Sequence, residues 1–229
     1  AEEWVVEQVG GARRGQGTGH DADFLITHPK HCAFTDLEAI LDHIVETLRG
    51  QQKLKLTCDG GWHMRQSGRT CRVAPGVALG RLGSRDAAVD PALYRQCSHI
   101  EKLRIEVSAN GRGWTHWDKL DRIFTVWQTT NTTQSESPPP LRRVDIIVVA
   151  YLEYPFALLT WTGSKVFNRL VRGLANNLGL SLSAHALLTV PDGRLVPYDT
   201  HPGQGPVRTE ADVLALLGLP YLPPHLRNA

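Results

Sequence analysis

Two aspartates spaced one residue apart offer the clearest chemistry in this sequence. Asp21-Ala22-Asp23 begins the apolar segment 21–27 (DADFLIT), whose pattern predicts a β-strand. Because side chains alternate along a strand, both carboxylates face the same side. Neighbouring carboxylates repel each other unless a positive charge lies between them. Oxygen ligands of this kind suit Mg²⁺ or Mn²⁺.

A third carboxylate, Asp145, lies inside the very apolar segment 144–150 (VDIIVVA). A charge in such a segment is costly unless it is paired or bound to a metal. If this strand lies beside 21–27, three aspartates can hold two metal ions, which suits in-line phosphoryl displacement. The plainer alternative is a surface pair of aspartates at a strand end, with Asp145 paired to Arg142 or Arg143.

A glycine-rich, basic loop (residues 10–19) precedes the paired aspartates. Gly10-Gly11 allows backbone N–H groups to approach an anion closely, and Arg13-Arg14 adds charge-assisted bonds to phosphate oxygens. A strand, a GG loop, a DxD strand and a later single Asp are together typical of nucleotidyltransferases related to DNA polymerase beta.

Longer segments extend this similarity to the family X DNA polymerases, on the side of the family that contains polymerase mu and terminal deoxynucleotidyltransferase. The segments are 10–27 (GGARRGQGTGHDADFLIT), 143–145 (RVD) with 155–169 (PFALLTWTGSKVFNR), and 209–229 (TEADVLALLGLPYLPPHLRNA). The resemblance implies an α+β fold: a polymerase beta-like palm with a mixed sheet, plus a small α/β thumb.

The same resemblance implies two domains. Residues 1–152 would form the catalytic palm, with a long insertion at about 58–116, and residues 153–229 the thumb. The chain starts at the first palm strand and lacks an initiator Met, which predicts a palm–thumb fragment or a minimal polymerase. An enlarged insertion would favour template-independent addition.

Roles follow position by position from the resemblance. Asp21, Asp23 and Asp145 would be the catalytic, metal-binding aspartates, and Asp145 would also help to activate the primer 3′-hydroxyl. The nucleotide would be held by the loop and by the palm–thumb junction. The residues concerned are Gly10, Gly11, Arg14, Gly19, His20, Trp161, Thr162, Gly163, Ser164, Lys165 and Arg169. For several of these a plainer alternative stays open: Trp161 as a core residue, and Lys165 and Arg169 as part of a solvated helix face.

Four positions depart from the family pattern near the nucleotide: Gln16, Gln128, Thr160 and Ala184. Each change removes a charge or alters the shape of the pocket. Because one charge-assisted hydrogen bond contributes roughly 1.5–3 kcal/mol, weaker triphosphate binding is expected.

The elements that must position these residues follow from hydrophobic periodicity and turn residues. Strands are expected at 4–9, 21–27, 53–57, 101–107 and 143–150, a helix changing to a strand at 118–128, helices at 35–49, 164–177 and 209–217, and a small sheet at 180–184, 186–190 and 194–197. Thr35, Ser164 and Thr209 stand at or near the starts of the three helices, and Thr35 and Thr209 are the expected N-caps.

Composition narrows the classes of protein. The 229 residues carry 25 basic and 23 acidic side chains, a net charge of +2, which is low for non-specific nucleic-acid binding. Four cysteines without a CxxC pair form neither a dense disulfide framework nor a zinc motif, so a reducing compartment is expected. No apolar run reaches the roughly 20 residues of a membrane span, and the N-terminus does not read as a signal peptide.

These observations lead to one expected function and one alternative. The expected function is a DNA nucleotidyltransferase that uses Mg²⁺ or Mn²⁺ to add nucleotides to a DNA 3′-end. The partners would be a primer end, a template and a nucleoside triphosphate, with end-joining proteins, in a monomer that acts in the nucleus and not at a membrane. The alternative is a catalytically weak scaffold that binds DNA ends.

Overall fold

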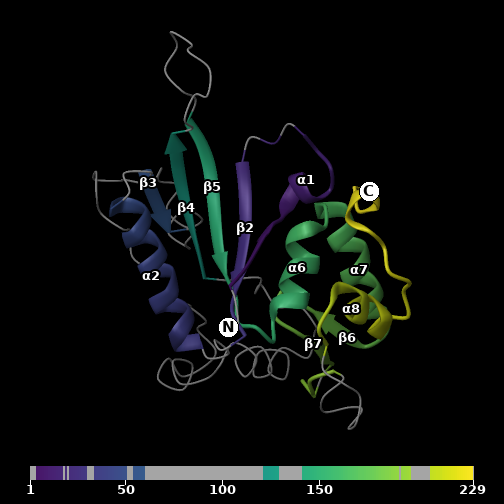
Figure 1. The fold of residues 1–229 in the computed structure, drawn as a ribbon. Coiled ribbons are helices and arrows are strands. Elements are labelled where there is room, and N and C mark those ends of the chain that lie inside the picture. Colours follow the sequence, from purple (N-terminus) through teal and green to yellow (C-terminus); the bar gives the residue numbers. More distant parts are fainter. Residues whose placement is uncertain are drawn as a thin grey trace, which may run out of the picture.

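The fold consists of a mixed β-sheet with a group of C-terminal helices beyond one end of it (Figure 1). The computed structural model describes residues 4–17, 19, 21–29, 34–50, 54–59, 121–128, 141–190, 192–196 and 207–228. In this described part of the chain, no helix is long and apolar enough to cross a membrane.

The main sheet has five strands in the order β1-β2-β5-β4-β3. β2 and β5 are parallel, and every other neighbouring pair is antiparallel. The sheet is therefore mixed, as expected. The strands are β1 (Val5–Gln8), β2 (Asp21–Thr27), β3 (Leu54–Asp59), β4 (Asp121–Gln128) and β5 (Leu141–Val148).

Helix α2 (Phe34–Gly50) covers one face of this sheet. Apolar side chains at every second position of β2, β4 and β5 pack against its apolar stripe, as two-residue and 3.6-residue periodicities require. The buried members of this core include Leu41, Val45, Ile123 and Ile146.

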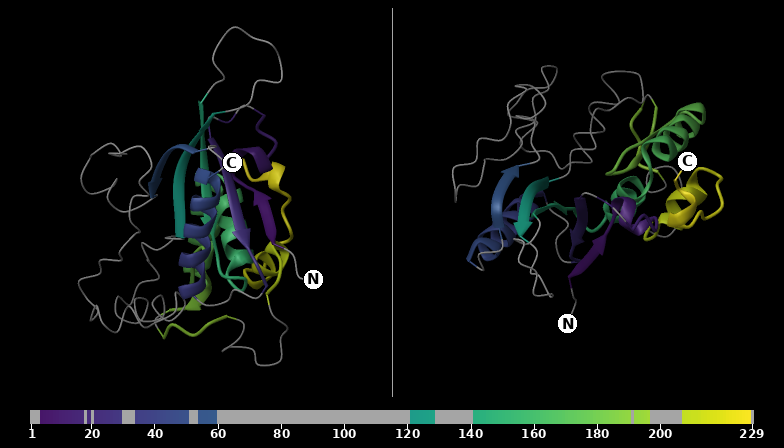
Figure 2. Two further views of the ribbon diagram at one scale, coloured as in Figure 1. Left: turned by 60° about the vertical axis from the view of Figure 1, so that its left-hand side comes forward. Right: turned by 90° about the horizontal axis from the view of Figure 1, so that it is seen from above.

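Helix α6 (Tyr154–Thr162) lies on the opposite face of the sheet, where Ala157 and Leu158 pack against Leu25 and Ile147. Its other side contributes Phe156 and Leu159 to a second core. Figure 2 shows the result from two more sides: α2 and β3 lie toward one edge of the sheet, and the C-terminal helices lie beyond the opposite edge. α6 is thus shared by the two cores.

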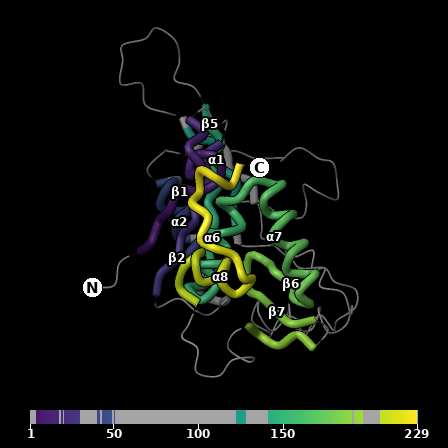
Figure 3. Tube along the Cα trace, turned by 90° about the vertical axis from the view of Figure 1, so that its right-hand side faces the viewer, coloured from purple at the N-terminus to yellow at the C-terminus, as the bar shows by residue number. Residues whose placement is uncertain are grey.

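The second core is built from the C-terminal elements. They are α7 (Lys165–Asn177), β6 (Leu180–Leu182), β7 (Leu187–Thr189), α8 (Glu210–Leu216) and the 3₁₀ turn η1 (Pro224–Leu226). β6 and β7 form an antiparallel pair, extended by a bridge between Leu188 and Leu195. Figure 3 shows the final segment running back along these helices toward α1 (Gly10–Arg13).

Several sequence predictions need correction. The expected loop 10–19 begins with a short helix, α1, because Gly10 adopts a positive φ of 68° and lets the chain turn at once. In the segment expected to change from helix to strand, residues 121–128 are all strand, since β4 pairs with a strand on each side, and residues 118–120 lie outside the described residues. The helix expected at Thr35 begins one residue earlier, at Phe34.

Other predictions are confirmed or lie outside the description. Thr209 caps α8 as expected, and the small β6–β7 sheet is present; Ser164, for which no cap was predicted, caps α7. The strand expected at 101–107 lies outside the described residues, as does the insertion 58–116 beyond Asp59. The division into domains at residue 152 stays a prediction.

Candidate active site

Strand register brings the three predicted aspartates to one face of the sheet. β2 and β5 pair in parallel with Asp23 directly opposite Asp145 and Asp21 opposite Arg143. This face is the one opposite α2, because the intervening Ala22 and Val144 point into the core beneath that helix. A pairing across 122 residues of sequence therefore assembles the carboxylates.

The Arg143 guanidinium bridges two of these carboxylates. Its Nε donates to Asp145 Oδ1 at 2.9 Å, and a terminal nitrogen donates to Asp145 Oδ2 at 3.0 Å. The same nitrogen forms an ion pair with Asp21. The pairing of Asp145 with Arg143, considered above as the plainer alternative, is confirmed as a contact, and it exists within the carboxylate cluster.

Burial and mutual repulsion disfavour the ionised carboxylates. Burial, the largest cause, together with the charge of Asp23 raises the pKa of Asp145 to about 6, although Arg143 opposes the shift. Burial and the Asp21 charge likewise raise the pKa of Asp23. Asp145 is only 2% exposed. The cluster therefore has less positive charge nearby than its carboxylates need.

The donor atoms fit a divalent cation by their chemistry. In the described ranges, no three His, Cys, Asp or Glu side chains form a ready metal site. Arg143 contacts two of the three carboxylates, yet the pKa values of Asp23 and Asp145 remain raised. Buried, under-compensated carboxylate oxygens are suitable ligands for Mg²⁺ or Mn²⁺, and Asp21, Asp23 and Asp145 are the residues that would hold the ion.

The glycine-rich loop lies directly against this cluster. Val9 donates its backbone N–H to the Asp23 carbonyl at 2.8 Å, which fixes the start of α1 on β2. Gly10 follows with a positive φ, and a Cβ atom there would lie 2.3 Å from Asp23 Oδ2. Glycine is thus required at this position both for backbone conformation and for space.

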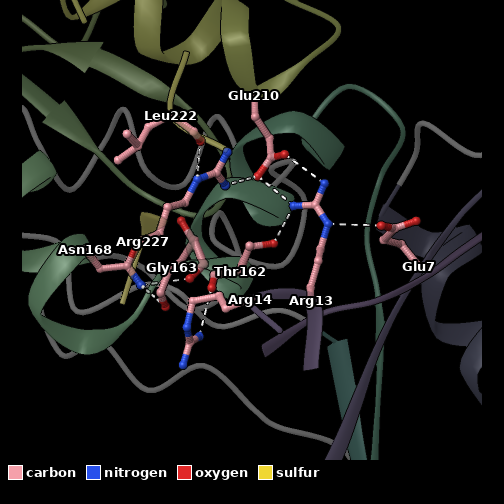
Figure 4. A network of polar contacts seen from close by, with 10 residues as sticks. Glu7, Arg13, Arg14, Thr162, Gly163, Asn168, Glu210, Leu222 and Arg227 are labelled. Carbon is pink, nitrogen blue, oxygen red and sulfur yellow. Dashed lines mark hydrogen bonds and ion pairs between the residues drawn. The ribbon is translucent and has the colours of Figure 1, made fainter. Parts of the chain in front are cut away.

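The two arginines of the loop have different partners. Arg13 makes a bidentate pair with Glu210, at 2.9 Å for each bond, and contacts Glu7 Oε1 and Thr162 Oγ1 at 3.0 and 2.7 Å. Figure 4 shows its guanidinium between these groups. Glu210 also pairs with the fully buried Arg227. Arg13 is therefore neutralised by carboxylates and joins the loop to α8.

Arg14 instead has neutral partners. Its guanidinium donates to the Thr162 carbonyl at 2.9 Å, to Asn228 Oδ1 at 2.8 Å and to Gln16 Oε1 at 3.2 Å. None of these acceptors carries a charge, so Arg14 keeps its positive charge beside the glycine-rich loop. The loop was expected to offer both arginines to an anion; the structure pairs Arg13 with carboxylates, and a role for Arg14 at an anion stays a prediction.

The residues of the α6–α7 junction that are predicted to bind the nucleotide each make a different structural contact. Thr162 is fully buried and accepts hydrogen bonds from both loop arginines. Ser164 Oγ accepts from the Phe167 N–H at 3.0 Å and caps α7. A Cβ at Gly163 would meet Phe167 at 2.4 Å. These three residues position the junction, and a nucleotide contact for each stays a prediction.

Trp161 lies between a core and the site face. It packs against the core beneath α6, yet its Nε1 has no hydrogen-bond partner in the described part of the chain. The Arg122 guanidinium lies 5.6 Å from the Trp161 ring and 5.2 Å from that of Phe124. Arg122 and Phe124 are on the site face of β4, since Phe124 pairs with Asp145.

The remaining predicted residues are more dispersed. Gly11 lies within α1, and Gly19 is exposed close to Asp21. Lys165 and Arg169 are exposed on α7. His20 lies outside the described residues.

The structure also locates the four residues that depart from the family pattern. Gln16 is exposed on the loop, and its amide accepts from Arg14 and donates to Asn228 at 3.2 Å. Ala184 is fully buried in the core beneath α6. The Thr160 carbonyl accepts from Asn168 at 2.7 Å. Gln128 is the last residue of β4.

Sequence reasoning missed Arg122, Glu210 and Asn228. Arg122 alternates with Phe124 in a segment that was interpreted partly as helix, which concealed its face. Glu210 and Asn228 lie within the C-terminal segment that carries the resemblance, but no local pattern links them to a loop some 200 residues earlier.

Comparison with known proteins defines the class. The family model described as DNA polymerase beta thumb matches residues 157–228. Together with the mixed sheet, this match makes the chain an α+β protein with a polymerase beta-like thumb. From here on, residues 157–228 are called the thumb.

Individual relatives extend the similarity beyond the thumb. The chain is 29% identical to DNA-directed DNA/RNA polymerase mu of Homo sapiens over 231 positions, and 31% identical to DNA nucleotidylexotransferase of Monodelphis domestica over 227; each alignment covers 98% of the chain and 37% of the relative. DNA polymerase lambda of Rattus norvegicus is 49% identical over 88 residues, 38% of the chain and 15% of that protein. The chain thus spans little more than a third of its curated relatives, and it belongs with the family X DNA polymerases.

Proposed function

We propose that this chain is the catalytic part of a DNA nucleotidyltransferase that adds nucleotides to a DNA 3′-end. The observation that carries the proposal is the parallel register that sets Asp23 opposite Asp145, with Asp21 on the same face and a glycine-rich loop beside them. Relatives named as DNA polymerases and as a DNA nucleotidylexotransferase support this class of reaction.

Each group on the site face has a role in this proposal. Arg14 and the backbone of Gly10 and Gly11 bind the triphosphate, because the partners of this arginine among the described residues are all neutral. Asp145 orients and helps to deprotonate the primer 3′-hydroxyl. Mg²⁺ or Mn²⁺ held by Asp21, Asp23 and Asp145 would stabilise negative charge on the attacking and leaving oxygens.

The biological setting is part of the proposal. A primer end with its template and a nucleoside triphosphate are the partners, together with end-joining proteins, and the reaction serves end joining of double-strand breaks in the nucleus. The chain acts as a monomer. The net charge of +2 is consistent with weak, salt-sensitive DNA binding by this part alone.

Primer extension tests the proposal. A bare single-stranded primer and a gapped duplex are offered side by side with deoxynucleotides and either Mg²⁺ or Mn²⁺. Extension of the bare primer identifies a terminal transferase, and extension of the gapped duplex alone identifies a template-dependent polymerase. Asp145→Ala must abolish either activity. Asp192→Ala removes an exposed carboxylate outside the aspartate cluster and must leave the activity in place.

A second candidate, a DNA-end scaffold with little catalysis, is favoured by one observation. Gln16 supplies no positive charge to the loop, and its amide is already bonded to Arg14 and Asn228. DNA binding without extension, unchanged in Asp145→Ala, would support the scaffold and contradict the enzyme.

A further inference from the structure

The C-terminal end of the chain closes over the glycine-rich loop. Arg14 Nε donates to Asn228 Oδ1 at 2.8 Å, and Gln16 Nε2 donates to the same oxygen at 3.2 Å. Gln16 Oε1 in turn accepts from Arg14 at 3.2 Å. Arg14, Gln16 and Asn228 therefore form a closed ring of hydrogen bonds, although Asn228 is 214 residues from Arg14 in sequence.

The orientation of the Asn228 amide is fixed by its other contact. Its Nδ2 donates to the His225 carbonyl at 2.9 Å, so Oδ1 must be the atom that faces Arg14. The backbone before it is anchored as well: the Arg227 carbonyl accepts from the Ser164 N–H at 3.1 Å, and the Arg227 side chain is buried against Glu210. Asn228 is thus presented to the loop from a well-held segment.

The charges of the partners decide what this contact does. A carboxylate at position 228 would neutralise Arg14, as Glu210 neutralises Arg13. An amide oxygen orients the guanidinium and leaves its charge available to an anion. The Thr162 carbonyl and the Gln16 amide, the other two acceptors, are neutral too.

We propose that Asn228 is a positioning residue for the triphosphate: it holds the Arg14 guanidinium at the glycine-rich loop through a neutral acceptor, so that the C-terminal segment of the thumb sets the affinity of the loop for polyphosphate. The inference rests on the proposed function, since it takes Arg14 to be the triphosphate ligand. It adds a residue that lies in the thumb and does not itself touch the nucleotide.

Binding of inorganic tripolyphosphate, measured by titration calorimetry on the full chain, tests this role without requiring turnover. Asn228→Leu removes the acceptor at similar size and is expected to weaken binding about five- to tenfold, the effect of one net hydrogen bond. Gln16→Leu is expected to weaken it less. Asn176→Leu, the same kind of substitution at an exposed position on α7, is the matched control and should leave binding unchanged.

The same Asn228→Leu substitution, made in an Arg14→Lys variant, distinguishes a positioning role of Asn228 from a general effect on the structure. Arg14→Lys keeps the positive charge but removes the Nε that Asn228 holds, so adding Asn228→Leu to it should weaken binding no further. An equal loss in both backgrounds would overturn the positioning role, as would wild-type affinity in Asn228→Leu. Failure of the wild-type chain to bind tripolyphosphate would instead contradict the triphosphate site of the proposed function, and the inference with it.

Discussion

The buried carboxylate of Asp145 lowers the stability of the folded protein at neutral pH. The side chain is 2% exposed and faces a second carboxylate, and its pKa is raised to about 6. A folded-state pKa above the ordinary 3.8 means that the folded protein resists ionisation. The contribution of Asp145 to stability is therefore most favourable below pH 4, falls as the pH rises from about 4 to 6, and stays unfavourable above that.

Replacing Asp145 with Asn should accordingly stabilise the metal-free protein at pH 7. A shift of about two pKa units corresponds to a gain of up to about 3 kcal/mol in the free energy of unfolding. Urea denaturation at pH 7 and pH 4 measures it, and the gain should disappear at pH 4. Asp192→Asn is the control, because hydrogen bonds from Thr189 and Arg194 lower the pKa of that exposed carboxyl and neutralisation should not stabilise there. A destabilised Asp145→Asn protein at pH 7 would contradict the argument.

Gly10 gives a second prediction at this scale. Gly10→Ala places a Cβ 2.3 Å from Asp23 Oδ2 and keeps a positive φ, so the carboxylate must move and the backbone is strained. We expect a loss of primer extension of at least a hundredfold. Gly15→Ala is the matched control, since its φ is 83° but nothing lies within 4 Å of the added Cβ. It should cost about 1–2 kcal/mol of stability and little activity. Equal activities in the two variants would show that the Asp23 contact is unimportant.

At the scale of elements, local patterns predicted most strands and helices but not their partners. β2 and β5 could be found because alternation and an apolar run are local signals, and α8 because Thr209 is a good cap. Within the segment predicted to change from helix to strand, residues 121–128 are strand throughout, because pairing with strands on both sides outweighs local propensity. The site depends on more distant pairings. The Asp23–Asp145 register has no local signature, so only the family resemblance grouped these two aspartates, and the Arg14–Asn228 contact could not be predicted from the sequence at all.

The N-caps of α7 and α8 allow the effect of a cap on stability to be separated from an effect on nucleotide binding. Ser164 accepts from Phe167 at the start of α7, and Thr209 accepts from Asp212 in a capping box at the start of α8. Ser164→Ala and Thr209→Ala should each lower the free energy of unfolding by about 1 kcal/mol. Only Ser164→Ala should also raise the KM for the nucleotide, because Ser164 is a predicted nucleotide contact. Urea denaturation and steady-state primer extension measure the two effects, and unchanged KM values in both variants would make Ser164 a cap alone.

At the scale of the whole molecule, polar contacts add to the apolar packing of α6 in joining the sheet to the C-terminal elements. α6 packs on both cores, while the loop after β1 reaches α8 and the C-terminal segment through Arg13, Glu210 and Arg227 (Figure 4). Glu210 is 4% exposed and Arg227 is fully buried. These charges compensate one another, and Glu210 is the carboxylate that links Arg13 of the loop to Arg227 of the thumb.

Glu210→Gln should therefore be among the most destabilising single changes in the chain. It leaves the fully buried Arg227 without its carboxylate and Arg13 with Glu7 alone. The loss of one partner of a buried ion pair costs about 3–5 kcal/mol. Glu7→Gln removes the other carboxylate of Arg13, which is 41% exposed, and should cost less than about 1 kcal/mol. Urea denaturation of both variants at pH 7 makes the comparison. Replacing Glu210, Arg13 and Arg227 together with Met should recover much of the loss, because no buried charge then remains unpaired. Similar, small losses for Glu210→Gln and Glu7→Gln would show that the loop is held to the thumb by apolar packing and not by this ion-pair network.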